Sequence, residues 1–135
     1  MTDYSKPLPV PDEETQPWFD ALREHKLLLQ YFPSADWYQY PYSERCQKDW
    51  STEWEWRESQ GQGTVYTWGQ MHQVYHPSWR EEAPYIVAVV ELDEGPRMNT
   101  TLINVDHTAI SCGMRVKVAF DDVTPEFTLP KFEPA

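Results

Sequence analysis

Apolar and polar side chains alternate along the C-terminal half of the chain, as they do in β-strands that bury one face. The segment 115–120 follows this period of two closely. The other expected strands are 63–75, 85–92, 97–105 and 128–132. The first of these is long, and we expect a bend or break near Gly69. A bent first strand followed by four more predicts a small Greek-key barrel of the OB type over residues 61–135.

The N-terminal part of the chain follows a different pattern. Residues 1–15 are polar and rich in proline and acidic side chains, which predicts a flexible lead-in. A helix is expected over 16–25, with Thr15 as its N-cap and an apolar stripe that includes Trp18 and Leu22. The stripe is narrow for a core helix, so the helix is expected to dock on a neighbouring surface.

Aromatic residues dominate the next segment. After a short strand over 27–31, the segment 31–56 holds nine aromatic residues in 26 positions and few aliphatic ones. Such a segment cannot bury an aliphatic core of its own. It must be held by aromatic stacking, by a metal, or by packing against another surface.

The net charge of the chain limits the classes of partner that we expect it to bind. Acidic residues outnumber basic ones by 22 to 11, for a formal net charge of −11. Such a chain repels phosphate backbones and anionic lipid, so we expect neither nucleic acid nor a membrane as a partner. The start of the chain lacks an apolar signal core, which predicts a cytoplasmic protein. Cys46 and Cys112 are therefore expected to be free thiols.

Five segments occur in an order that resembles one known family. They are 17–22, 61–66, 84–97, 113–116 and 129–132. The chain resembles a bacterial and archaeal family of zinc-ribbon plus OB-fold proteins, catalogued as a domain of unknown function and associated with acyl-CoA enzymes. The resemblance implies a mainly β fold, with a leading helix and a rubredoxin-like ribbon in 16–60 and the barrel in 61–135. It also implies a small partner of thiolases, steroid side-chain aldolases, acyltransferases or hydratases.

The chain departs from that family at the metal ligands. The resemblance assigns the ligand positions to Phe32, Ala35, Cys46 and Asp49, of which only Cys46 keeps a thiol. Structural zinc needs a full tetrahedral set of ligands, mostly Cys or His. We therefore predict a degenerate ribbon without zinc and no other cofactor. Stacked aromatic rings could take over the role of the metal. Alternatively, the segment is loosely ordered by itself and its rings form a partner interface.

Several residues are candidates for binding acyl-CoA. Trp68, His72, His76 and Trp79 would border a mouth that faces the acyl chain, although surface packing at the rim explains the same residues. Arg97 follows a turn at a strand start, where its guanidinium could bind a phosphate of CoA. A surface ion pair with a neighbouring glutamate is the simpler interpretation of Arg97.

Motifs for independent catalysis are absent from the sequence. There is no nucleophile elbow, glycine-rich phosphate loop or His-Glu-x-x-His pattern. The adjacent carboxylates, such as Asp93 and Glu94, are expected in solvated turns, and His107 is expected in a plain turn. We therefore assign no catalytic residue.

Together these features predict a non-catalytic accessory subunit. It would bind a thiolase-like enzyme in a hetero-oligomer and help to form the acyl-CoA entrance, with Trp18, Phe19 and Leu22 docking on the partner. One alternative is a stand-alone module that binds acyl-CoA or lipid. A third possibility is that His72 or His76 lends a proton to the partner's chemistry.

Overall fold

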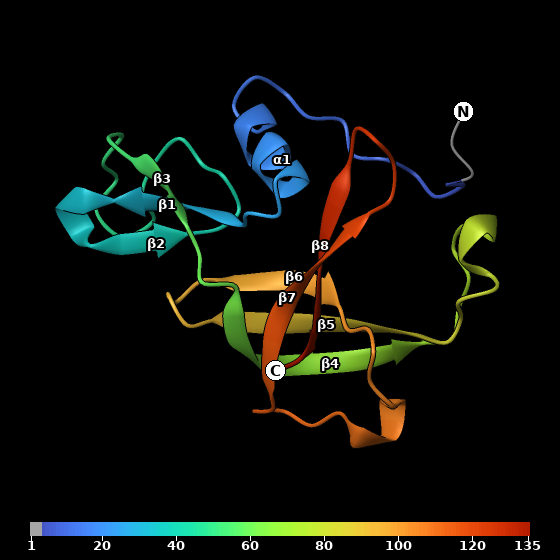
Figure 1. The fold of residues 1–135 in the computed structure, drawn as a ribbon. Coiled ribbons are helices and arrows are strands. Elements are labelled where there is room, and N and C mark those ends of the chain that lie inside the picture. Colours follow the sequence, from blue (N-terminus) through green and yellow to red (C-terminus); the bar gives the residue numbers. More distant parts are fainter. Residues whose placement is uncertain (1–3) are drawn as a thin grey trace.

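The computed structural model describes residues 4–135 of the chain. Residues 1–3, the start of the expected lead-in, lie outside the described residues. One helix, a three-stranded sheet and a five-stranded sheet follow one another along the sequence (Figure 1). The elements are α1 (Gln16–Arg23), β1 (Leu28–Phe32), β2 (Trp37–Gln39), β3 (Glu55–Glu58), β4 (Gln62–Met71), β5 (Tyr85–Leu92), β6 (Arg97–Thr101), β7 (Arg115–Asp122) and β8 (Thr128–Pro134).

Helix α1 begins as the sequence predicts, but its first turn is held differently. Thr15 occupies the N-cap position without a capping bond from its side chain. Its hydroxyl and its backbone N–H instead donate to the carboxylate of Asp12, which fixes the turn that leads into the helix. The helix ends at Arg23, two residues before the predicted end. No helix in residues 4–135 has both the length and the apolar character needed to cross a membrane.

The small sheet has the order β2-β1-β3, and all of its pairs are antiparallel. Its strands are short, and segments of irregular chain connect them, as Figure 1 shows beside α1. Leu27 and Leu29 are buried and reach the main core, which they share with Leu22 of the helix. The helix and one face of β1 are thereby attached to the barrel.

The large sheet has the order β6-β5-β4-β7-β8, with antiparallel pairing throughout. Strand β4 pairs with β5 along its length and with β7 at its start, so it bends from one layer into the other. A parallel bridge between Leu102 and Phe132 brings the two edge strands together. This nearly closed five-stranded barrel confirms the predicted OB-type fold.

Strand β4 breaks at a different place from the one predicted. Gly69 lies opposite Val87 in a regular part of the ladder, whereas the register shifts between Val65 and Thr67. An extra residue at this point increases the local twist, as the bend of the strand requires. Strand β4 also ends at Met71 rather than at residue 75.

The core of the barrel is aliphatic. Its buried side chains come from every strand of the large sheet and include Val65, Val90, Met98, Val116 and Phe132. Strands β4 and β5 approach closely at Gly63. A Cβ atom there would lie 2.4 Å from the carbonyl oxygen of Glu91, so only glycine fits.

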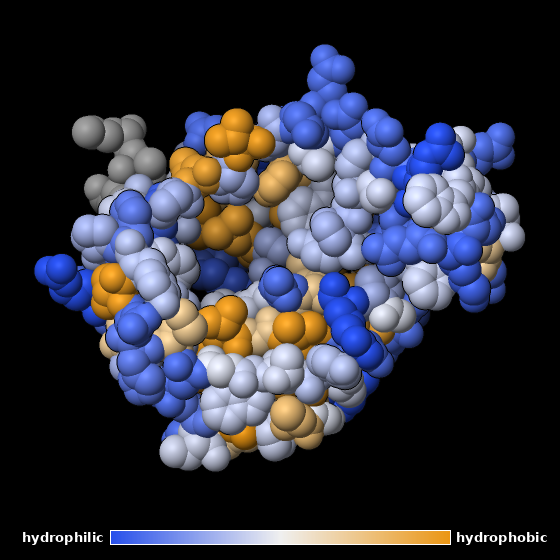
Figure 2. Space-filling model, turned by 180° about the vertical axis from the view of Figure 1, so that it is seen from behind, coloured by the Kyte–Doolittle hydropathy of each residue, from blue (hydrophilic) through white to orange (hydrophobic). Residues whose placement is uncertain are grey.

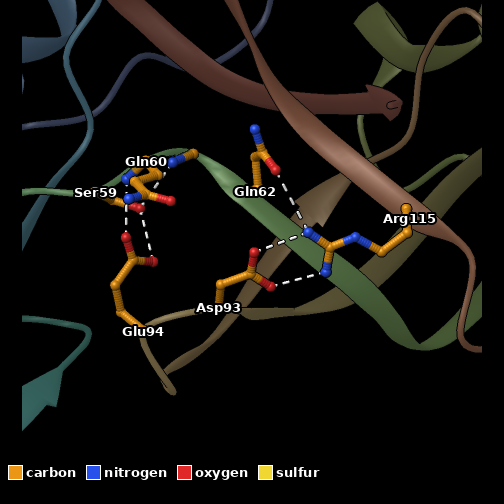
Figure 3. A network of polar contacts seen from close by, with 7 residues as sticks. Ser59, Gln60, Gln62, Asp93, Glu94 and Arg115 are labelled. Atoms are coloured by element: carbon orange, nitrogen blue, oxygen red, sulfur yellow. Dashed lines mark hydrogen bonds and ion pairs between the residues drawn. The ribbon is translucent and has the colours of Figure 1, made fainter.

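A polar network fastens the connection between the two sheets (Figure 3). Glu94, in the β5–β6 turn, accepts hydrogen bonds from the Ser59 hydroxyl at 3.0 Å and the Gln60 backbone N–H at 2.8 Å. Beside it, Asp93 accepts two bonds of 2.8 Å from the guanidinium of Arg115. The two carboxylates expected to be free in a solvated turn therefore hold the linker and strand β7.

Candidate ligand cavity

A cavity of about 470 Å³ lies beside the helix at the gap between β6 and β8. This volume falls in the range of roughly 300–1,000 Å³ that is typical of small-molecule sites. The face seen in Figure 2 is hollowed near its centre, and apolar residues gather around the hollow. The apolar part of the cavity lining includes Trp18, Phe19, Trp79, Tyr85, Ile103 and Leu129.

The topology of the sheet explains why a cavity forms here. Strand β5 pairs with β6 over five residue pairs, and β7 pairs with β8 over seven. Strands β6 and β8 meet through the single bridge at Leu102 and Phe132. The remaining space is therefore lined by side chains of the two strands and of α1.

Several polar groups that line the cavity have partners within the protein. Thr100 donates to the carbonyl of Pro130 at 3.2 Å, and Thr101 donates to that of Ile86 at 2.8 Å. Nδ1 of His107 lies 3.1 Å from the side-chain nitrogen of Gln70. Lys131 forms an ion pair with Asp121. Because these groups are engaged, the cavity offers mainly apolar surface to an occupant.

The N-terminal segment and the β4–β5 loop meet at one side of the cavity. Lys6 forms an ion pair with Glu82, and its ammonium lies 4.8 Å from the ring centre of Trp79. The Trp79 ring packs on Tyr85, with 4.7 Å between ring centres. These contacts hold two aromatic cavity residues in place.

The structure brings only some of the predicted site residues together. Trp18, Phe19 and Trp79 line the cavity. Trp68 packs half-buried against the barrel core and does not line the cavity. His72 and His76 are exposed beyond the end of β4, where the ring of His76 accepts a hydrogen bond from the Ser78 backbone N–H.

Leu22 differs from the expectation that it docks on a partner. Its side chain is completely buried and belongs to the main core. The helix stripe has two parts: Leu22 faces the barrel, whereas Trp18 and Phe19 stay partly exposed at the cavity. The sequence pattern could not separate them because all three positions fall on one side of the helix.

Arg97 makes the simpler contact that its sequence position suggests. Its guanidinium bonds to Glu91 at 3.0 Å and lies 3.8 Å from the ring centre of Tyr66. The bond with Glu91 holds the pKa of Arg97 above its usual range. Arg97 lies outside the cavity lining, on the side of the barrel that faces β2.

Sequence reasoning missed several residues of the cavity. Tyr85 and Ile103 looked like ordinary strand residues, and His107 like a turn residue, because nothing in the local pattern marks the β6–β8 gap. The proline before Tyr85 was an available signal of chain irregularity. The strand predicted over 97–105 ends at Thr101 in the structure, and no local pattern marked that end. The sequence could not show that these segments converge.

The small sheet contains an unexpected pair of polar clamps. Gln30 and Gln39 lie opposite each other on β1 and β2, and both are buried. The side chain of Gln30 donates to the Ser43 carbonyl and accepts from the Ser43 N–H, both at 2.9 Å. Gln39 donates to the Arg45 carbonyl at 3.0 Å and accepts from the Gln47 N–H at 2.9 Å. The oxygen and the nitrogen of each amide therefore both hold the loop against the sheet.

Two of the four positions assigned to metal ligands, Phe32 and Ala35, have side chains without a donor atom for a metal. Phe32 is completely buried, and the Asp49 carboxylate accepts bonds from the Ser34 hydroxyl at 2.6 Å and the Ser51 N–H at 3.0 Å. These bonds, led by that from Ser34, hold the pKa of Asp49 well below its usual range. Cys46 and Asp49 offer one soft and one hard donor, which do not fit structural zinc.

The aromatic rings of this segment divide into different environments. Phe32 is buried, whereas Trp50 is 72% exposed and cannot act as internal packing. Tyr31 and Tyr38 pack together with 4.8 Å between ring centres. Tyr42, Trp54 and Trp56 form a second group, with 4.9–6.4 Å between ring centres. The rings therefore form separate groups rather than one stack.

Comparison with known proteins finds a matching family model and several similar sequences. The family model of the ChsH2 C-terminal OB-fold domain matches residues 56–121. The chain is 34% identical to a probable enoyl-CoA hydratase alpha subunit of Thermomonospora curvata over 130 residues, which are 96% of this chain and 40% of that protein. It is 31% identical to a DUF35 domain-containing scaffold protein of Methanocaldococcus jannaschii over 90 residues, 67% of this chain and 58% of that one.

A solved structure matches almost the whole chain in three dimensions. A chain of the Ltp2-ChsH2(DUF35) aldolase superposes with a TM-score of 0.83 at 32% identity. The match covers 94% of this chain and 98% of that one. By contrast, the chain spans less than two thirds of either sequence relative.

Proposed function

Since the chain belongs to the DUF35 family, with an OB-fold domain of the ChsH2 type, we propose that it is a non-catalytic accessory subunit of a thiolase-like acyl-CoA enzyme. It would form a hetero-oligomer with that enzyme and complete its acyl-CoA entrance. The observation that carries the proposal is the near-complete match to a chain of an aldolase whose name joins two components, Ltp2 and ChsH2(DUF35). The scaffold and hydratase-subunit names of the relatives support the same role.

The chemistry of the cavity supports an acyl chain as its occupant. Its lining is rich in aromatic and aliphatic side chains, and several of its polar groups are bonded within the protein. An alkyl or steroid-like acyl group gains free energy by leaving water for such a surface, about 25 cal/mol for each Å² buried. Among the described residues that line the cavity, Lys131 is the only Lys or Arg, and it is paired with Asp121. In this proposal the partner therefore binds the nucleotide end of CoA, and this chain encloses part of the acyl end.

We further propose that the small sheet is a ribbon that folds without zinc. Gln30 and Gln39 hold the loop that a metal would otherwise fix, and the bond from Ser34 to Asp49 joins the two expected ligand segments. Elemental analysis of the purified protein and thermal melts with and without a strong chelator test this proposal. Stoichiometric zinc, or a melting temperature that falls with chelator, would contradict it.

Reconstitution tests the accessory role. The tagged chain is used to capture its partner from native lysate, and the partner is then expressed with and without the chain. We expect a thiolase-like enzyme whose activity on acyl-CoA depends on the complex. A chain that is monodisperse alone and binds acyl-CoA tightly without a partner would support the stand-alone module instead.

A pair of tryptophan substitutions tests the cavity. Ile103→Trp fills part of it, whereas Val87→Trp adds the same ring on the exposed face of β5. In the reconstituted complex we expect Ile103→Trp to raise KM for long acyl-CoA substrates with little effect on short ones. Equal kinetic effects of both variants would contradict a role of the cavity in acyl binding.

A further inference from the structure

A second, smaller cavity lies between α1 and the small sheet. Its volume is about 160 Å³, below the roughly 300 Å³ at which small-molecule sites begin, so it suits a single side chain. We call this cavity the aromatic cup. Its aromatic lining residues are Trp18, Phe19, Tyr40, Tyr42 and Trp56.

Several polar groups in the cup bond within the protein. Gln30 and Gln39 line it, and the nitrogen and oxygen of both amides bond to the loop after β2. The indole N–H of Trp18 donates to the Leu28 carbonyl at 2.9 Å. The interior of the cup therefore contacts an occupant through ring faces, ring edges and aliphatic carbon.

Negative charge surrounds the rim at Tyr42. Partial burial raises the pKa of the Tyr42 phenol, and the carboxylates of Glu14, Glu44 and Asp12 raise it further. Bonds from Thr15 keep the pKa of Asp12 below its usual value, so this carboxylate stays ionised at neutral pH. Within residues 4–135, neither Glu14 nor Glu44 forms an ion pair with a basic side chain. The residues that line the cup likewise include no Lys or Arg in this part of the chain.

We propose that the aromatic cup is a docking site for an arginine side chain of a partner protein. The aliphatic stem of the arginine packs among the rings of Trp18, Tyr42 and Trp56. Its guanidinium faces the rim, where the Asp12 carboxylate is bonded to the lining residue Thr15. Glu14 precedes Thr15 in the chain, and Glu44 follows the lining residue Tyr42 by two positions. Complementarity of charge selects a cation for this rim, and the aromatic walls favour a planar guanidinium, which stacks on ring faces, over a strongly hydrated ammonium. Arginine is also enriched at the centres of protein interfaces.

This inference rests on the proposed function in one respect: it takes the partner to be the enzyme subunit. Binding of the side chain itself needs no enzyme. The two claims can therefore fail separately: if the cup binds the arginine probe but the chain captures no thiolase-like enzyme, only the accessory role is refuted.

The test uses the full chain and a small probe, N-acetyl-arginine amide. The indole N–H resonances of Trp18 and Trp56 report occupancy of the cup in NMR titrations. We expect a saturable shift of both resonances with the arginine probe. The citrulline analogue has the same shape without the charge, and we expect it to bind about fivefold more weakly. Absence of a saturable shift with arginine, or equal binding of citrulline, would overturn the proposal.

Charge variants provide the matched control. Glu44→Gln removes a carboxylate from the rim, whereas Glu126→Gln removes one from the exposed β7–β8 loop. Both change the net charge equally and lie on the surface, so both should fold. We expect Glu44→Gln to weaken arginine binding about threefold at low salt and Glu126→Gln to leave it unchanged. Equal weakening by the two variants would mean that only overall charge attracts the probe. A lysine amide that binds as tightly as arginine would overturn the selection of guanidinium.

Discussion

The two sheets of this chain are held together by different interactions. The barrel encloses an aliphatic core to which each of its strands contributes, including Phe132 and Val90. The small sheet buries two glutamines and uses them to bind the backbone of its own loop. The comparison shows that a short segment with too little apolar surface can be ordered by buried amides whose oxygen and nitrogen both bond to the backbone.

The largest effect is expected in the barrel core. Phe132→Ala removes a ring that is completely buried beside the bridge to Leu102, and should cost about 3–5 kcal/mol in the free energy of unfolding. Urea denaturation measures this loss. Val87→Ala, on the exposed side of β5, is the control and should cost less than about 1 kcal/mol. Similar losses for both variants would mean that the core does not dominate stability.

A smaller and more local effect is expected from a glutamine clamp. Gln39→Met keeps the size of the side chain but leaves the Arg45 carbonyl and the Gln47 N–H without their partner, which costs about 1–3 kcal/mol. Hydrogen exchange should accelerate in residues 43–51 and stay unchanged in β5. Gln47→Met, at an exposed side chain in the same loop, should leave both regions unaffected. Uniform acceleration in both sheets would show that they unfold as one unit.

The polar network between the two sheets should contribute less to the free energy of unfolding. Glu94→Ala removes the acceptor for Ser59 and Gln60, at a cost of about 1 kcal/mol. We expect faster exchange at the Gln60 amide, measured by NMR, because its partner is lost. Asp93→Asn weakens only the exposed pair with Arg115, worth about 0–1 kcal/mol, and should not change exchange at Gln60.

The smallest effect is a pH dependence of the small sheet. The pKa of Asp49 is lower in the folded chain than the unfolded value of about 3.9, so its contribution to stability is complete above that pH and is lost as the pH falls toward the folded pKa. Asp49→Asn should therefore melt below the wild type at pH 7, and the difference should shrink at pH 3. Asp106→Asn provides the control in the barrel, because its lowered pKa also arises from local bonds, there with Thr108. It should show the same trend without faster exchange in 43–51. A difference for Asp49→Asn that grows at low pH would contradict the assigned shift.

The sequence predicted the barrel well because its strands carry a local signal. Alternation in 115–120 and the β-branched run in 85–92 mark strands whatever their neighbours are. The bulge at Tyr66 depends on where β4 leaves one partner strand for another, so no local pattern could place it. The cavity combines residues from α1, the β4–β5 loop, β6 and β8, and only their convergence in space reveals it.

The glutamine clamps were hidden from the sequence for a different reason. Glutamine is mostly a surface residue, and nothing around Gln30 or Gln39 marks them as buried. In the sequence, the abundant rings are therefore the visible candidates to replace a metal. One of those rings, Trp50, is largely exposed to solvent, whereas the amides make bonds that fix the loop.

Trp18 is a wall common to the large cavity and the aromatic cup, together with Phe19 and Tyr40. An occupant of one cavity that tilts this indole changes the volume of the other cavity. Thermodynamic linkage then requires reciprocity. If an occupant of the cup raises the affinity of the cavity for an acyl group, the acyl group raises the affinity of the cup for its occupant by the same factor. Through the Trp18 side chain, binding of the partner and binding of the acyl group would then be coupled.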